Sequence, residues 1–167
     1  DLRQGSAVDL PFADASFDAA ISQFGFEYGR AHKIARQMAR VLKPGARFSF
    51  IVHHAEGTVV TANRAHLDLM RIVQGPQMQA LVLSGSAFVV EQKLRALARA
   101  HPGDTLLEPL LQKLPERTRG NSAARKQAWL ALNEALAPGR VILESLDVCC
   151  VAADEIEGWL GPLRQFF

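Results

Sequence analysis

The chain has 167 residues, of which 49% are hydrophobic and 22% are charged, and its formal net charge at pH 7 is +2. This composition is typical of a soluble globular protein, and the near balance of charge gives no general attraction to nucleic acid or acidic membranes. No apolar run reaches the roughly 20 residues that a membrane-spanning helix needs, so we expect no membrane span.

Residues 1–55 show the pattern of an α/β fold. Residues 17–24 form an apolar run after a turn, residues 30–42 have helical spacing, and residues 46–52 alternate as in a strand. Pro44 cannot continue a helix, and Gly45 can adopt the left-handed turn that leads into the next strand. The order strand, helix, strand predicts a parallel crossover. The apolar stripe of the helix is Ile34, Met38, Val41 and Leu42, its cations are Lys33, Arg36 and Arg40, and one strand face carries Phe48, Phe50 and Val52.

Residues 56–137 are expected to be almost wholly helical. Glycine and proline pairs end three helical patterns, and Ser86 is a plausible N-terminal cap. Thr105 and Glu108 have the spacing of a capping box, although Pro109 follows directly. The three pairs are Gly75-Pro76, Pro102-Gly103 and Pro138-Gly139.

Residues 138–167 are expected to return to the core through a strand and a helix. Residues 140–152 contain β-branched and apolar residues and predict the strand, and residues 154–167 have helical spacing at Ile156, Trp159, Leu160 and Leu163. The strand would point the adjacent Cys149 and Cys150 to opposite faces, since neighbouring cysteines form only a strained bridge. Two reduced thiols favour a cytoplasmic protein.

The first third of the chain resembles class I S-adenosylmethionine-dependent methyltransferases, and in particular the small-molecule branch of ubiquinone and menaquinone biosynthesis. The resemblance depends on several short motifs in the family's order and spacing, which are Gly5, Ala7, Leu10-Pro11-Phe12, Asp14, Ser16-Phe17-Asp18 and Arg40-Val41-Leu42-Lys43-Pro44-Gly45. It implies a partial Rossmann-like sheet with a mostly helical insertion, and methyl transfer to a small molecule. The family's glycine-rich cofactor loop is absent from these 167 residues, so the chain is expected to be an interior piece of a longer enzyme that binds the cofactor weakly by itself.

The resemblance also implies where S-adenosylmethionine would bind. Ser6 and Ala7 lie at the family's adenine site, with Ser6 where the family usually has Asp, and a hydroxyl is the weaker partner because it carries no charge. The end of the first strand would line the methionine and methyl part of the cofactor, through Ser22, Gln23 and Phe24.

His53 and His54 are the candidate catalytic residues, because they follow the second strand where the fold faces the acceptor. Imidazole titrates near neutrality and can take a proton from an acceptor hydroxyl or amine. The alternative is that both are loop histidines, solvated or paired with Glu56. No cluster has metal-ligand spacing, so no metal is expected.

The helical insertion is expected to cover the acceptor pocket and to select the substrate. Met70, Met78, Phe88 and Trp129 are pocket or core residues, with the core favoured. Cations dominate residues 113–126, which predicts a solvated loop, with an anionic acceptor or RNA as the alternative; they are Lys113, Arg117, Arg119, Arg125 and Lys126.

Two other functions stay open at this point. A degenerate domain could serve as a non-catalytic helical interaction module. The other alternative is an RNA methyltransferase, which would be expected to have a broader basic face than this sequence offers. No nucleic-acid partner is therefore expected. Exposed sheet edges would favour self-association.

Overall fold

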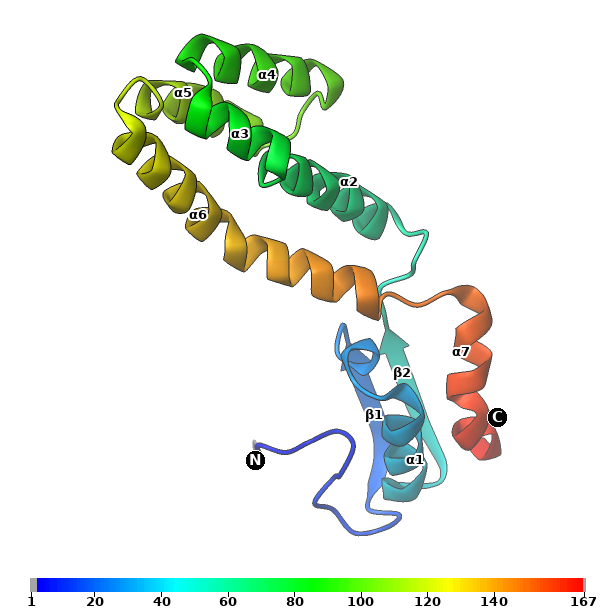
Figure 1. The fold of residues 1–167 in the computed structure, drawn as a ribbon. Coiled ribbons are helices and arrows are strands. Elements are labelled where there is room, and N and C mark those ends of the chain that lie inside the picture. Colours follow the sequence, from blue (N-terminus) through cyan, green and yellow to red (C-terminus); the bar gives the residue numbers. More distant parts are fainter. Residues whose placement is uncertain (1–2, 167) are drawn as a thin grey trace. The chain divides into compact units, whose positions relative to one another are not determined.

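The computed structural model describes residues 3–166 (Figure 1). These residues form two parallel strands, seven helices and two short 3-10 turns, which are labelled η. In chain order the elements are β1 (Phe17–Gln23), η1 (Phe26–Tyr28), α1 (Ala31–Val41), β2 (Leu42–Ile51), α2 (Thr58–Val73), α3 (Pro76–Ser84), α4 (Ala87–Ala100), α5 (Leu107–Arg117), α6 (Ser122–Cys149), α7 (Ala153–Leu160) and η2 (Gly161–Phe166). Among these residues, none of the helices combines the length and apolar character needed to cross a membrane.

Two compact units divide the chain. The α/β unit contains the residues up to Ala62 and those from Ser145 onward, and the helical unit is Asn63–Glu144. Each unit has its own cluster of buried apolar side chains. The division that the sequence predicts is into a core of residues 1–55, a helical insertion of residues 56–137 and a return to the core over residues 138–167. This division stays a prediction.

The α/β unit is built on the predicted strand–helix–strand crossover. β1 and β2 pair in parallel, with Ala20 opposite Phe48 and Ser22 opposite Phe50. α1 ends at Val41, and Gly45 has φ +77°, the left-handed conformation expected at this position. The mixed α/β class and the partial Rossmann-like sheet are therefore confirmed.

One face of the two-stranded sheet is covered and the other is open among the described residues. Ile34 of α1 and Leu163 of η2 are buried in the core of the unit. Phe26 stacks on Phe50 with ring centres 4.5 Å apart, and Trp159 of α7 lies 5.6 Å from Phe26. The predicted face of Phe48, Phe50 and Val52 packs against this core. On the other face Phe17, Ile21 and Ile51 are exposed.

The helical unit confirms most of the predicted helix ends. Ser86 caps α4 by accepting a hydrogen bond from the Val89 amide at 3.3 Å. α2 and α4 end shortly before the two glycine and proline pairs that the sequence marks. Met70, Met78 and Trp129 are buried, as the favoured core interpretation requires, whereas Phe88 is exposed.

The capping box predicted at Thr105 and Glu108 is wrong. α5 begins at Leu107, and its preceding turn is held by Asp104, whose Oδ1 accepts from the Leu106 amide at 2.8 Å. The same carboxylate pairs through Oδ2 with His66 Nδ1 at 2.7 Å. An aspartate two residues before the amide closes this turn directly, so the threonine hydroxyl is not needed.

The strand predicted over residues 140–152 is also wrong. α6 continues through Pro138 and Gly139 to Cys149, and only Val151 forms a bridge, with His54. Once a helix has formed, each further turn costs little, and an Arg140–Glu144 ion pair at 3.0 Å spans one such turn. Both cysteines therefore lie at a helix end as half-buried thiols that form no disulfide.

Candidate active site

The carboxyl ends of β1 and β2 lie side by side because the strands are parallel (Figure 1). Phe24 follows β1 with φ +51°, and its amide donates to the Ile51 carbonyl at 2.8 Å. A left-handed phenylalanine is unusual and costs conformational energy. This turn sends the chain away from the sheet and into η1. In open α/β sheets, ligands bind beyond these strand ends.

η1 places a buried carboxylate beside the first residues after β2. The side chain of Glu27 is 0% exposed, and its Oε1 accepts a hydrogen bond from the His53 amide at 3.1 Å. The same oxygen lies 2.8 Å from His53 Nδ1. A carboxylate is an acceptor only, so this contact places a proton on Nδ1 and leaves Nε2 as the outward nitrogen.

The second oxygen of Glu27, Oε2, is buried and has no hydrogen-bond partner among the described residues. Buried polar atoms are almost always paired, and an unpaired one usually has a functional reason. Oε2 therefore provides an acceptor position for a hydroxyl, an amine or a water.

Two exposed aromatic rings flank His53. The Phe24 ring stacks on the imidazole with centres 4.4 Å apart, and the Tyr28 ring meets it edge-on at 6.3 Å. Burial raises the pKa of the Tyr28 hydroxyl above 10.0, and the negative charges of Glu27 and Cys149 raise it further. Tyr28 is thus a neutral hydrogen-bond donor at physiological pH.

His54 has a different environment from His53. Its Nδ1 accepts from the Glu56 amide at 3.1 Å, within a tight turn, and its backbone pairs with Val151. The expected neighbour Glu56 is therefore present, through its backbone. One imidazole nitrogen of each histidine is therefore engaged, by the buried Glu27 carboxylate at His53 and by a backbone amide at His54.

The structure brings together only some of the residues predicted to bind the cofactor. Phe24 contacts His53. Ser22 and Gln23 are the last two residues of β1; Ser22 is half-buried and Gln23 is exposed. Ser6 and Ala7 lie in an exposed turn closed by Asp9. Among the described residues, no hydrogen bond or ring contact joins this turn to the strand ends.

Sequence reasoning missed Glu27 and Tyr28. The signal was present in the segment Gly25–Gly29, where a single acid stands between two aromatic residues and two glycines directly after a strand. In an open loop this carboxylate would be exposed to solvent. The 3-10 turn buries it instead. No group of three potential metal ligands gathers anywhere in residues 3–166.

Residues 1–50 match the family model described as a methyltransferase domain. We call residues 1–50 the methyltransferase segment. The methyltransferase segment contains β1, α1 and nearly all of β2, and it ends three residues before His53.

Several curated proteins are similar to part of the chain. The 2-phytyl-1,4-naphtoquinone methyltransferase of Synechococcus elongatus is 44% identical over 55 residues, which cover 32% of this chain and 24% of that protein. The uncharacterized methyltransferase YcgJ of Bacillus subtilis is 37% identical over 72 residues, covering 42% and 28%. The demethylmenaquinone methyltransferase of Corynebacterium kroppenstedtii is 46% identical over 49 residues, covering 29% and 21%.

Each match covers less than a third of the relative's own length. No solved structure matches the chain significantly. The expected resemblance to quinone-pathway methyltransferases is thus confirmed.

Proposed function

We propose that the protein transfers a methyl group from S-adenosylmethionine to a small-molecule acceptor. The observation that carries this proposal is the match of residues 1–50 to a methyltransferase domain, with an aromatic His53–Glu27 site at the strand ends of that segment. When bound, S-adenosylmethionine supplies an electrophilic methyl group and leaves as S-adenosylhomocysteine.

The residues at the strand ends fit this cofactor in kind. Phe24 offers an exposed ring, Ser22 a half-buried hydroxyl, and Gln23 an amide, all at the edge where open α/β sheets bind ligands. We assign these three residues to the methionine and methyl end of the cofactor. Ser6 and Ala7 stay candidates for the adenine end, where Ser6 would donate its hydroxyl hydrogen bond.

His53 is the proposed general base. Glu27 holds Nδ1–H through a 2.8 Å hydrogen bond, which leaves the lone pair on Nε2 for the proton that the acceptor loses on methylation. Phe24 and Tyr28 restrict the imidazole to one plane, so little reorientation is needed before proton transfer. His54 is the second candidate base.

The acceptor is proposed to be a quinone-type ring. The names of two similar proteins, a 2-phytyl-1,4-naphtoquinone and a demethylmenaquinone methyltransferase, support this choice. A reduced quinone carries acidic hydroxyl hydrogens, which suits a neutral imidazole base. The helical unit is the proposed cover of the acceptor, and the reduced thiols of Cys149 and Cys150 support a cytoplasmic setting.

Cofactor binding is tested by adding S-adenosylmethionine to the isotope-labelled chain and following backbone amide signals by NMR. This method detects weak binding, which the absent glycine-rich loop leads us to expect. We expect saturable shifts at Ser22, Gln23 and Phe24, and smaller shifts when Phe24→Ala is used. An unchanged spectrum at millimolar cofactor would contradict the proposal and favour the non-catalytic interaction module.

The role of His53 is tested by methyl transfer to a reduced short-chain naphthoquinone. His53→Gln is expected to lower kcat about a hundredfold or more while leaving KM for the cofactor nearly unchanged. His54→Gln is the matched control and is expected to retain most activity. Equal losses in both variants would remove the distinction between the two histidines.

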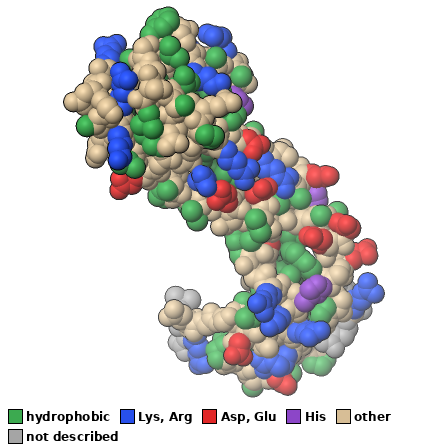
Figure 2. Space-filling model, viewed as in Figure 1, with side chains coloured by type: hydrophobic (Ala, Val, Ile, Leu, Met, Phe, Trp, Pro, Cys, Tyr) green, Lys and Arg blue, Asp and Glu red, His purple; other side chains and the backbone are tan. Residues whose placement is uncertain are grey.

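An RNA acceptor is the less favoured alternative. On the face shown in Figure 2, Lys and Arg side chains form separate groups over the helical unit rather than a continuous band. Binding of single-stranded RNA also requires aromatic side chains beside the cations, on which the bases stack. Salt-dependent transfer of the methyl group to RNA, with none to the naphthoquinone, would favour this alternative.

A further inference from the structure

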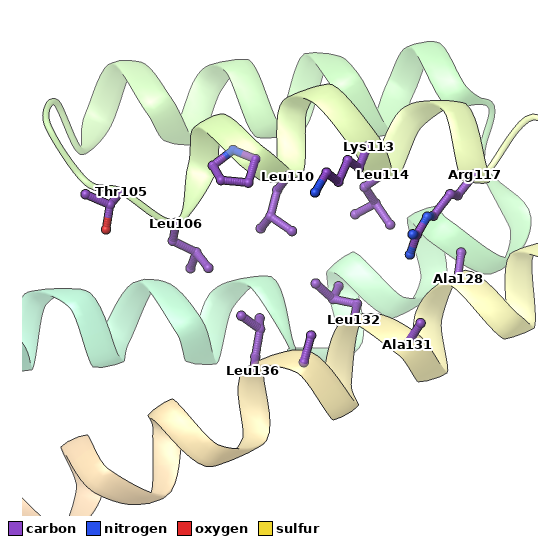
Figure 3. Close-up of a pocket in the computed structure, with 12 residues that line it drawn as sticks. Thr105, Leu106, Leu110, Lys113, Leu114, Arg117, Ala128, Ala131, Leu132 and Leu136 are labelled. Atoms are coloured by element: carbon purple, nitrogen blue, oxygen red, sulfur yellow. The ribbon is translucent and has the colours of Figure 1, made fainter.

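An open groove runs between α5 and α6, within the helical unit (Figure 3). Its volume is about 410 Å³, which lies in the range of small-molecule sites. Leu106, directly before α5, and Leu110 of α5 face Leu132 and Leu136 of α6 across the groove. This groove belongs to the helical unit alone and is not part of the His53 site.

Small side chains on α6 keep the groove open. Ala128, Ala131 and Ala135 stand at helical spacing on its groove-lining face, where leucines would reach across to α5. A second, shallower hollow continues along α6 as far as Ala124. It shares Arg117, Ala128 and Ala131 with the first. The two hollows together follow α6 for 13 residues, a length of about 20 Å.

The lining changes from apolar to cationic along the groove. At one end Leu106 lies opposite Leu136, and at the other end Arg117 lies opposite Ala128, with Lys113 between them on α5 (Figure 3). The sequence predicted a solvated loop for these cations, but Lys113 and Arg117 extend from the last turns of a helix. A ligand that matches this lining is apolar along most of its length and negatively charged at one end.

The two cations have no internal partner. Among the described residues, neither Lys113 nor Arg117 forms an ion pair or hydrogen bond, and no Asp or Glu lines the groove. Neutralisation of the helix dipole accounts for a cation in the last turn of α5, such as Arg117. It does not account for Lys113, which stands one turn earlier on the same stripe as Leu106 and Leu110.

We propose that the groove between α5 and α6 binds a single-chain anionic amphiphile, a fatty-acid-like carboxylate whose chain lies between the leucines and whose head group lies between Lys113 and Arg117. The alanines of α6 provide the width for the chain, and burial of the chain provides most of the affinity. The two cations select the carboxylate over neutral and cationic heads of the same length.

The test is a titration of the full chain, below the micelle concentration, with three ligands of equal chain length: dodecanoate, dodecanol and dodecyltrimethylammonium. Trp129 neighbours the groove residue Ala128, and Trp159→Phe leaves Trp129 as the single fluorescent reporter. We expect saturable binding of dodecanoate, at least threefold to tenfold tighter than of the other two, and weaker at high salt.

Matched substitutions locate the site. Lys113→Gln and Arg117→Gln are each expected to weaken dodecanoate binding severalfold, whereas Lys126→Gln, which removes an exposed cation outside the groove, leaves it unchanged. Ala135→Phe fills the groove and is expected to abolish binding, while Ala137→Phe on the same helix does not. Lys113, Arg117, Lys126 and Ala137 are all exposed. Their substitution should therefore leave the fold intact, which circular dichroism can check.

Several outcomes would overturn the proposal. Equal affinity for dodecanol would show an apolar site without head-group selection, and unchanged binding in Ala135→Phe would place the ligand elsewhere. Binding only to anionic lipid vesicles, with none to monomeric dodecanoate, would assign the cations to a membrane surface. Because none of these measurements involves S-adenosylmethionine, they are independent of the proposed methyl transfer.

Discussion

The Glu27 carboxylate brings together most of the features of the candidate active site. It lies in a three-residue turn, it is inaccessible to solvent, and one of its oxygens holds both the amide and the ring of His53. Burial of a carboxylate is costly unless its hydrogen bonds are made. The charge of Glu27 is one of the causes that raise the pKa of its neighbour Tyr28.

Tyr28 is the single tyrosine in the sequence, so the absorbance of phenolate on alkaline titration reports this residue alone. We expect a midpoint above 10.0, because burial and then the charges of Glu27 and Cys149 disfavour the phenolate and raise the Tyr28 pKa. Glu27→Gln should lower the midpoint toward 10.0 without reaching it, since burial is the larger cause. Glu56→Gln, which changes an exposed acid three residues after His53, is the control and should leave the midpoint unchanged.

The same shift fixes the sign of a pH effect on stability. A raised pKa means that the folded state holds the phenolic proton more tightly than the unfolded chain. The stabilisation from Tyr28 is thus complete below pH 10 and is lost as the pH rises through the pKa of the folded state. A Tyr28 midpoint at or below 10.0 would contradict the partial desolvation of Tyr28, which is the larger cause of its raised pKa.

At the scale of single elements, Arg40 connects α1 to the segment that precedes β1. Its guanidinium donates to the Phe12 carbonyl at 2.7 Å and to the Leu10 carbonyl at 2.8 Å, and it pairs with Asp14 at 2.7 Å. Sequence analysis placed Arg40 with Lys33 and Arg36 as a cation on the polar helix face. The structure instead gives it a role in folding, because one side chain holds an irregular segment that has few contacts of its own.

Arg40→Ala should lower the free energy of unfolding by about 1–3 kcal/mol, because two backbone carbonyls and a carboxylate lose a charged donor. Arg36→Ala is the matched control, since Arg36 is exposed on the same helix, and we expect it to change the stability by less than about 0.5 kcal/mol. Urea denaturation followed by circular dichroism gives both values. Equal effects of the two variants would show that the Arg40 hydrogen bonds contribute nothing net.

α6 contains Pro138 in its interior. A proline there removes a backbone hydrogen bond and crowds the preceding turn, at a cost of about 3 kcal/mol. Pro138 is exposed, so Pro138→Ala removes no buried contact. We expect the variant to be more stable by up to about 3 kcal/mol, with slower amide hydrogen exchange in residues 134–142.

The Pro138 variant also decides between a helix and the strand that the sequence predicts after Gly139. If residues 140–152 formed a strand, Pro138→Ala would leave hydrogen exchange beyond Gly139 unchanged and would give little stabilisation. Gly139→Ala is a useful companion, because its added Cβ would meet only the flexible end of Met70 at 3.4 Å.

The errors of the sequence analysis have a common physical origin. Local signals, such as the Ile34 stripe, the Ser86 cap and the turn at Gly45, were enough to locate α1, α4 and the crossover. Pro138 was misjudged because a long helix can absorb one unfavourable residue, which is a property of the whole element. Glu27 was missed because its importance depends on His53, 26 residues away, and no local pattern reports such a contact.

At the scale of the whole molecule, the open sheet face is the feature that should most affect behaviour in solution. Parallel strands are normally covered on both faces, but among the described residues the face that carries Phe17, Ile21 and Ile51 is exposed, with Ile21 at 83%. β1 also pairs on one side only, with β2, in the described part of the chain. Exposed apolar surface and an unpaired strand edge both favour association with another chain.

We therefore expect the 167-residue chain to self-associate, with a sedimentation coefficient that rises with concentration. Ile21→Lys should shift the equilibrium toward monomer, because it places a charge at the centre of the exposed face and takes no buried side chain away. Val89→Lys is the matched control, since Val89 is an exposed apolar residue on α4 of the helical unit. If the chain is monomeric at all concentrations, or if Val89→Lys has the same effect as Ile21→Lys, the sheet face is not the surface that associates.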